Sequence, residues 1–357
     1  MNVRAEFQVV TTSESPEGKG GFVSVCPEKA TYTRFLLDLK AAGTLAGEAE
    51  YFVAVDGEGE RIGRMATTVG PDPGTGLIGL FALTKKRSDK VWVQSVTRGL
   101  LSSCERWLAS RGVDKVYGPV DFSTFFDYRF RDRTGEEGLG PDFSWEPTQP
   151  QSYLLAFGAA GYTPAERYHS VFYETSKAFP TRSVAKIWEP AWRTAIDRGM
   201  EFVAFDDVQP VETLIPIVEA ITFDAFKENF LYSPIRSEVF QAMYAPIVKR
   251  LDLSLSHLVR APDGEAVGFT YAFEDTGYCV AKSTAVRPAW RGLRLSSALT
   301  YRCLMRADER GLTKFASALV RDGNVNEFLE NWHHPHPVRV WKHHYTLLGR
   351  TLKGAGR

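Results

Sequence analysis

The sequence of 357 residues has few cysteines and no net charge, and both absences exclude classes of function. Its four cysteines, Cys26, Cys104, Cys279 and Cys303, lie far apart and form no CxxC pair. Neither a zinc knuckle nor a disulfide framework is therefore indicated, and we expect buried free thiols. The 43 basic and 43 acidic side chains cancel, so the whole molecule has no electrostatic attraction to DNA or to an anionic membrane.

Long apolar runs are also missing. No window approaches the roughly 20 apolar residues that cross a bilayer. Residues 1–10 include Arg4 and Glu6 and lack the apolar core of a signal peptide. We expect no membrane segment and no export, and hence a cytoplasmic protein. The sequence has no G-x-S-x-G elbow, and its cysteines have no visible histidine partner, which disfavours a covalent acyl-enzyme.

The chain is long enough for two domains, and its hydrophobic pattern repeats once. Short β-branched and aromatic segments separated by Gly/Pro/Asp turns predict strands, and apolar residues at spacings of three and four predict helices. The first copy is predicted to hold strands at 51–56, 61–69 and 77–83, a helix at 91–111, a strand at 114–118, a helix at 152–160 and a strand pair over 162–174. The second copy is predicted to hold strands at 201–205, 255–260, 266–273 and 277–286, a helix at 295–310, a strand at 313–320, a short helix and a last strand at 339–349.

The segment GYCVAKSTAVRPAWRGLRLS at 277–296 reads as a strand, a loop and the start of a helix. It strongly resembles the donor-binding element of the GNAT (GCN5-related N-acetyltransferase) family, in which a strand precedes R/Q-x-x-G-x-G/A and a long helix. At such a helix start, free backbone N–H groups and the helix dipole receive the pyrophosphate of coenzyme A. Arg291 takes the first motif position, whereas Arg294 stands where glycine is usual and Ser296 where Gly or Ala is usual. Arg294 either obstructs coenzyme A or adds a guanidinium contact to its phosphate.

The resemblance implies acetyl-CoA or another acyl-CoA as co-substrate. The residues implied in holding it are Ala285, Val286, Arg287, Arg291, Gly292, Leu293, Arg294, Leu295 and Ser296. Asn324 and Asn326 follow the next strand, where the family commonly has an asparagine that contacts the donor. A simple helix N-cap is the alternative for either asparagine.

The first copy has the same element order but no R-x-x-G-x-G pattern, and it lacks glycine between Leu83 and Gly99. Its segment YGPVDFSTFFDYRF at 117–130, with Trp145-Glu146-Pro147, resembles a loop motif of tandem bacterial GNAT-like proteins. We therefore predict an α+β protein of two tandem GNAT-like domains, each with a mixed, mostly antiparallel twisted sheet flanked by helices. Residues 1–180 form the degenerate domain and residues 181–357 the domain with the donor loop.

Candidates for acid–base chemistry are few. Glu274 and Tyr278 are candidate bases at the strand before the donor loop, although a turn or surface role fits each equally. In the family, a tyrosine seven residues after the asparagine often acts as the general acid. Counting seven residues from Asn326 gives His333, which is therefore the candidate acid here. The histidine run at 332–337 has no partner carboxylate or cysteine at ligand spacing, so we expect no metal.

Acceptor contacts are predicted at Asn229 and Phe230, in an aromatic segment that covers the acceptor in the family, and at Ser283, where strand amides would face the donor. The resulting hypothesis is an N-acyltransferase that moves an acyl group from acyl-CoA to an amine of a small molecule by direct attack. Five arginines and no acid at 285–306 leave aminoacyl-tRNA open as an alternative donor. A non-catalytic binding protein is the third hypothesis.

Overall fold

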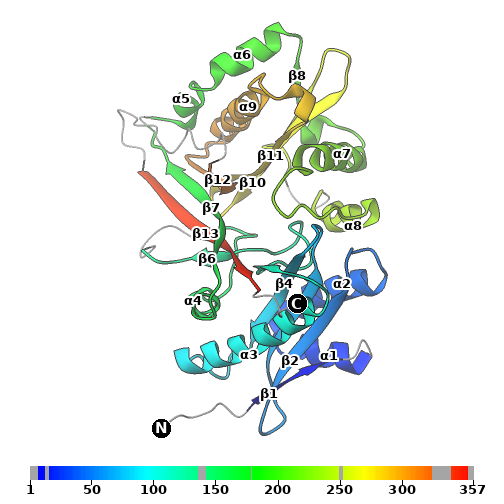
Figure 1. Cartoon of the computed structure of the whole chain (residues 1–357). Coiled ribbons are helices and arrows are strands. Elements are labelled where there is room, and N and C mark those ends of the chain that lie inside the picture. The colour runs from blue at the N-terminus through cyan, green and yellow to red at the C-terminus, as the bar shows by residue number, and fades with distance from the viewer. Residues whose placement is uncertain are drawn as a thin grey trace.

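A computed structural model describes residues 7–12, 16–135, 142–177, 179–248, 252–323 and 339–352 (Figure 1). We call residues 7–177 the first half and residues 179–352 the second half. Helices and strands alternate in both halves, and a mixed sheet passes through the two, which confirms the predicted α+β class.

The elements of the first half are β1 (Phe7–Thr11), α1 (Pro16–Ser24), α2 (Ala30–Ala41), β2 (Ala49–Asp56), β3 (Arg61–Val69), β4 (Thr75–Leu83), α3 (Lys90–Ala109), β5 (Lys115–Gly118), β6 (Phe130–Asp132), α4 (Gln151–Ala159) and β7 (Thr163–Glu174). From β2 to α4 the first half follows the predicted order, with the short strand β6 in addition.

The elements of the second half are α5 (Thr181–Ala185), α6 (Glu189–Asp197), β8 (Glu201–Ala204), α7 (Leu214–Phe226), α8 (Ser237–Val248), β9 (His257–Arg260), β10 (Ala266–Asp275), β11 (Tyr278–Val286), α9 (Leu295–Glu309), β12 (Lys314–Arg321) and β13 (Arg339–Thr351). From β8 onward the second half repeats the order of the first, although its described residues hold no counterpart of β6 and α4.

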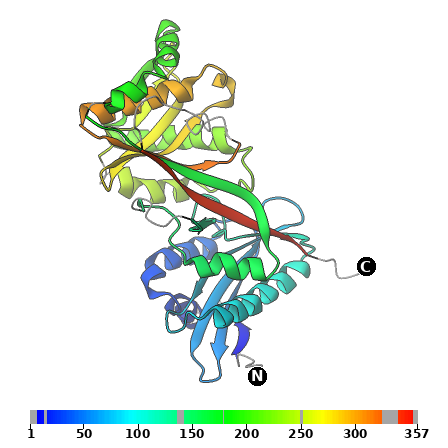
Figure 2. The same ribbon diagram turned by 90° about the vertical axis from the view of Figure 1, so that its left-hand side faces the viewer.

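The two halves exchange their last strands. The order of the sheet is β1-β2-β3-β4-β5-β13-β7-β12-β11-β10-β9-β8, with β6 paired to β13. Thus β13, from the end of the chain, lies beside β5 of the first half, and β7 lies beside β12 of the second half. The two strands pair antiparallel along their length and cross between the lobes in Figure 2.

This exchange corrects the prediction of a strand pair over residues 162–174. That segment is a single strand, β7, because its antiparallel partner is β13 rather than a neighbouring turn of the same chain segment. The division at residues 180 and 181 stays a prediction, and the sheet of each half contains a strand from the other.

Helices cover both faces of the sheet in the second half. Successive residues of a strand point to opposite faces. Cys279 packs against Cys303 of α9, whereas Val280 joins the cluster that includes Leu214 and Ile221 of α7. We call these the α9 face and the α7 face.

Candidate active site

Strands β11 and β12 separate midway along their length. Their parallel pairing covers only Cys279–Ala281 opposite residues 315–317. Lys282 then forms a bulge in β11, because Tyr271 pairs with Ser283 and Ala272 with Ala281. Leu319 of β12 takes a left-handed φ of 58°.

Residues 282–286 of β11 therefore have no strand partner on the side of β12. Within the described residues, no backbone hydrogen bond from another segment occupies this edge. We call this edge, residues 282–286, the strand opening. The backbone N–H and C=O groups that point to this side are available to an extended ligand, whereas those on the other side face β10.

The chain then delivers a helix start beside the strand opening. After Val286 the loop 287–294 leads to α9, whose N-cap is Arg294 with φ 57° and no side-chain cap hydrogen bond. The first turn of α9 contains no acidic residue. The first backbone N–H groups of a helix have no intrahelical acceptor, and together with the helix dipole they attract an anion.

The equivalent helix in the first half has its own anion. The N-cap of α3 is Asp89, whose carboxylate accepts a hydrogen bond from the backbone N–H of Trp92 at 2.9 Å. A carboxylate of the chain thus occupies the position that α9 leaves to solvent or ligand. This difference fits the absence of a glycine-rich loop before α3.

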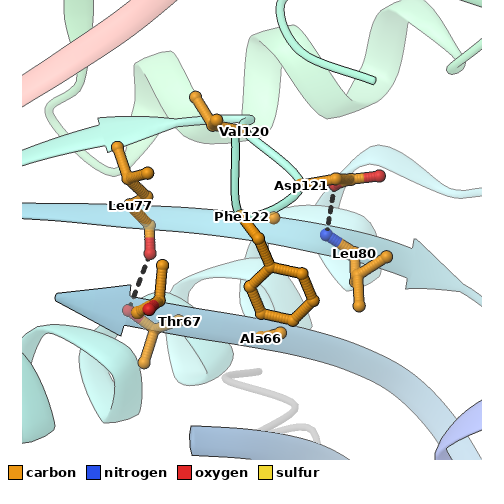
Figure 3. Close-up of a pocket in the computed structure, with 9 residues that line it drawn as sticks. Ala66, Thr67, Leu77, Leu80, Val120, Asp121 and Phe122 are labelled. Carbon is orange, nitrogen blue, oxygen red and sulfur yellow. Dashed lines mark hydrogen bonds between the residues drawn. The ribbon is translucent and has the colours of Figure 1, made fainter. Parts of the chain in front are cut away.

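In the first half, the corresponding gap between β4 and β5 is filled by the chain itself. Strands β4 and β5 pair only over residues 75–77 and 115–117, but Val120 then donates its N–H to the carbonyl of Ile78 at 2.7 Å. Figure 3 shows Asp121 accepting the N–H of Leu80, at 2.6 Å. A Cβ at Gly79 would lie 2.1 Å from the carbonyl oxygen of Val120, so β4 and the segment at Val120 are in direct contact and leave no room for a ligand between them. Burial raises the pKa of Asp121 to about 6.

Two of the predicted donor-site arginines anchor the loop to the chain. Arg287 donates to the carbonyl of Ala266 at 3.1 Å and lies within 4 Å of Asp224 and Glu265. Arg291 donates to the carbonyl of Ala225, at the end of α7, at 2.7 Å. Both therefore position the loop.

Arg294 is placed differently from these two. Its side chain is exposed and has no carboxylate within 4 Å among the described residues. Gly292 and Leu293 lie in the same loop, Leu295 and Ser296 begin α9, and Ala285 and Val286 end β11 at the strand opening.

The candidate bases lie away from the strand opening. Glu274 and Tyr278 flank the β10–β11 turn, and Tyr278 is five residues, about 16 Å of strand, from Ser283. Glu274 pairs with Arg310 at 2.8 Å, and the hydroxyl of Tyr278 donates to Glu174 at 2.8 Å. The geometry brings neither of them to the donor loop, because the hairpin register fixes both at its far end.

Among the acceptor candidates, Ser283 lies in the strand opening directly after the bulge. Phe230 follows α7 and packs edge-on against Tyr117 of the first half, with ring centres 5.2 Å apart, so it belongs to the contact between halves. Asn229 is exposed, and its backbone N–H donates a hydrogen bond to the carbonyl of Phe226, the last residue of α7.

Asn324, Asn326, His333 and the histidine run at 332–337 lie outside the described residues. In the ranges that are described, no group of three or more His, Cys, Asp or Glu side chains could hold a metal ion. The expectation of a metal-free site stays a prediction.

Sequence reasoning missed a buried polar cluster beside the site. Glu146, in a loop of the first half, accepts from His343 Nδ1 at 2.7 Å and from the Tyr345 hydroxyl, and it pairs with Arg131 at 3.0 Å. Leu319 donates its N–H to Ser170, which also accepts from Tyr345. The alternation of Trp341, His343 and Tyr345 on one strand face was the available signal.

Comparisons with known proteins give a family match for part of the second half and several similar structures. Residues 182–319 match the family model described as acetyltransferase (GNAT) domain. A probable N-acyltransferase from Enterococcus faecalis is similar at a TM-score of 0.52 and 10% identity, over 97% of this chain and 72% of that one. A tandem GNAT protein from the clavulanic acid biosynthesis pathway is similar at a TM-score of 0.48 and 11% identity, over 97% and 98% of the two chains.

A fungal multi-domain β-N-acetylglucosaminidase with a GCN5-related glucosamine N-acetyltransferase region is similar at a TM-score of 0.47 and 13% identity. The match covers 98% of this chain but only 38% of the fungal one. No curated protein matches the chain in sequence. None of the helices in the described ranges is long and apolar enough to span a membrane. Residues 182–319 thus match an acetyltransferase (GNAT) domain, and the fold of the chain is similar to that of the Enterococcus faecalis protein.

Proposed function

We propose that the second half transfers an acyl group from acyl-CoA to an amine of a small molecule. The observation that carries this proposal is the difference between the halves. The second half has an open strand edge at residues 282–286 next to an uncapped helix start, whereas Asp121, Val120 and Asp89 fill the same two positions in the first half. An open edge can hold an extended chain, and an uncapped helix start can hold its phosphates.

In this proposal the backbone of β11 does much of the chemistry. The acyl chain lies in the strand opening, and N–H groups at 283–286 polarise the thioester carbonyl. The neutral amine attacks the carbonyl carbon, the carbon–sulfur bond breaks, and the thiolate of coenzyme A leaves and takes up a proton. The amine loses one proton to solvent or a base.

A covalent intermediate on cysteine does not fit the geometry. Cys279 is the cysteine of β11, and it is fully buried against Cys303 with 3.6 Å between the sulfur atoms. Contact with Cys303 and burial raise the pKa of Cys279 well above its usual value, so the reactive thiolate is suppressed. Direct attack needs no such group.

The aminoacyl-tRNA alternative stays a prediction. The run of arginines at 285–306 is the observation that suggested it. Arg287, Arg291 and Arg306, however, each lie within 4 Å of a carboxylate of the chain. Paired arginines offer less attraction to a phosphate backbone than free ones.

Titration calorimetry of the full chain tests the proposed donor. We expect micromolar binding of acetyl-CoA, and weaker binding of dephospho-CoA, since it lacks one phosphate. Bulk tRNA at low and moderate salt serves as the comparison. Absence of acetyl-CoA binding together with salt-sensitive tRNA binding would overturn the acyl-CoA proposal in favour of the tRNA donor.

Replacing Arg294 decides whether it obstructs the donor or holds it. The backbone of Arg294 already has the left-handed conformation that suits glycine, and its side chain is exposed, so we expect a phosphate contact. Arg294→Gly should preserve the fold and weaken acetyl-CoA binding about fivefold, the equivalent of about 1 kcal/mol. Tighter binding in the same calorimetric titration would identify the arginine as an obstruction.

A further inference from the structure

Two cations lie at the strand opening on the α7 face. Lys282 occupies the bulge of β11, and its ammonium group lies 5.2 Å from the ring centre of Trp145. Trp145 itself packs against Tyr271 and Phe273, which belong to the α7-face cluster. Lys282 therefore projects to the face opposite α9.

Arg129 is the second cation. Its guanidinium lies 4.0 Å from the ring centre of Tyr128 and 4.2 Å from that of Tyr168. It is only 5% exposed, and it reaches the carbonyl of Leu319, on the β12 side of the strand opening, at 3.5 Å. Burial, and after it the positive charge of Arg129, lowers the pKa of Lys282 to about 8.

Neither cation has a carboxylate of the chain within 4 Å among the described residues. A buried charge without a counter-charge is costly, and like charges placed together raise the cost. The backbone around them is strained as well, because Arg129, Trp145 and Leu319 are non-glycine residues with φ of 68°, 73° and 58°. Strained residues of this kind gather at binding and catalytic sites.

The two faces of the sheet separate the two substrates. Phosphates bound at the start of α9 would lie on the α9 face, so an acyl chain entering through the strand opening would present its carbonyl toward the α7 face. The acceptor must then approach on the α7 face, where Lys282 and Arg129 lie. Trp145, a residue that is 42% exposed, provides a partly accessible aromatic wall there.

We propose that Lys282 and Arg129 bind a carboxylate of the acceptor, so that the acceptor is an amino acid or another amine that carries a carboxylate. This inference rests on the proposed acyl transfer. A carboxylate supplies the missing counter-charge, and arginine binds it through two parallel N–H groups. The pair thus selects the acceptor by charge, at a place separate from the donor phosphates.

Matched pairs of amines test this inference. Each pair consists of an amino acid and the amine left when its carboxylate is removed, such as phenylalanine and phenethylamine, histidine and histamine, or lysine and cadaverine. Release of coenzyme A from acetyl-CoA is followed with a thiol reagent. We expect kcat/KM at least tenfold higher for the carboxylate member of the accepted pair.

The variant Lys282→Met should lose this preference at least tenfold, mainly through the KM for the acceptor. Lys186→Met, at an exposed lysine after α5, is the matched control and should keep the preference. Equal turnover of both members of every accepted pair, or an unchanged preference in Lys282→Met, would overturn the carboxylate site. Either result would leave the proposed acyl transfer from acetyl-CoA untouched.

A binding readout separates this inference from the donor proposal. Melting temperature is measured with each amino acid and each decarboxylated amine, without acetyl-CoA. Stabilisation by carboxylate members that disappears in Lys282→Met supports the site even where acetyl-CoA fails to bind. The same stabilisation in both proteins, or none in either, contradicts it.

Discussion

Replacing Ser296 with aspartate is expected to weaken acetyl-CoA binding at least about 30-fold, the equivalent of about 2 kcal/mol, while the protein stays as stable as before or gains slightly. Ser296 is the second residue of α9, at the helix start that has no acid and no side-chain cap. A carboxylate there interacts favourably with the helix dipole, by about 0.3–1 kcal/mol. It also repels the pyrophosphate of the donor.

The opposite signs of these two effects make the test specific. Calorimetry measures the affinity and a melting curve measures the stability. The control is Asp89→Ala at the start of α3, which should cost about 1 kcal/mol of stability through loss of a helix cap and leave the acetyl-CoA affinity unchanged. Unaltered binding in Ser296→Asp would place the phosphates somewhere other than α9.

Replacing Glu146 with leucine is expected to destabilise the protein by about 3 kcal/mol, measured by the urea midpoint of unfolding. The side chain of Glu146 is 0% exposed and that of Arg131 is 2% exposed. Without this carboxylate, Arg131 loses its buried counter-charge and is left with an ion pair to the half-exposed Asp142, and His343 Nδ1 loses its acceptor.

The exposed pair of Glu189 and Arg193 provides the comparison. Glu189→Leu removes an ion pair of similar length, 2.6 Å, on the surface of α6, and it should change stability by less than about 1 kcal/mol. Equal midpoints for the two variants would show that the Glu146 cluster does not hold β13 to the loop of the first half.

The secondary structure of the proposed donor element was predictable because it is local. The strand, loop and helix start of 277–296 lie within 20 consecutive residues, and the structure has β11 over Tyr278–Val286 and α9 from Leu295. The αL backbone of Arg294 also stands where the resemblance expects glycine. Hydrophobic periodicity and turn residues suffice for features of this range.

Features that depend on distant residues were not predictable. Asp121 closes the first half by bonding to Leu80, 41 residues away, and Glu146 meets His343 across 197 residues. The exchange of β7 and β13 is of the same kind, because strand pairing follows the tertiary fold rather than the local pattern. Glu274 and Tyr278 are near the donor loop in sequence, but the hairpin register places both at the far end of the β10–β11 hairpin.

The central claim is that the second half alone binds the acyl donor, at the strand opening and the start of α9. Hydrogen–deuterium exchange with and without acetyl-CoA tests it most directly, because both halves are followed in one experiment. The account predicts that backbone amides within 282–298 exchange at least about tenfold more slowly with the donor, while those within 78–92 are unchanged. Slower exchange within 78–92, or no change within 282–298 under saturating acetyl-CoA, would contradict it.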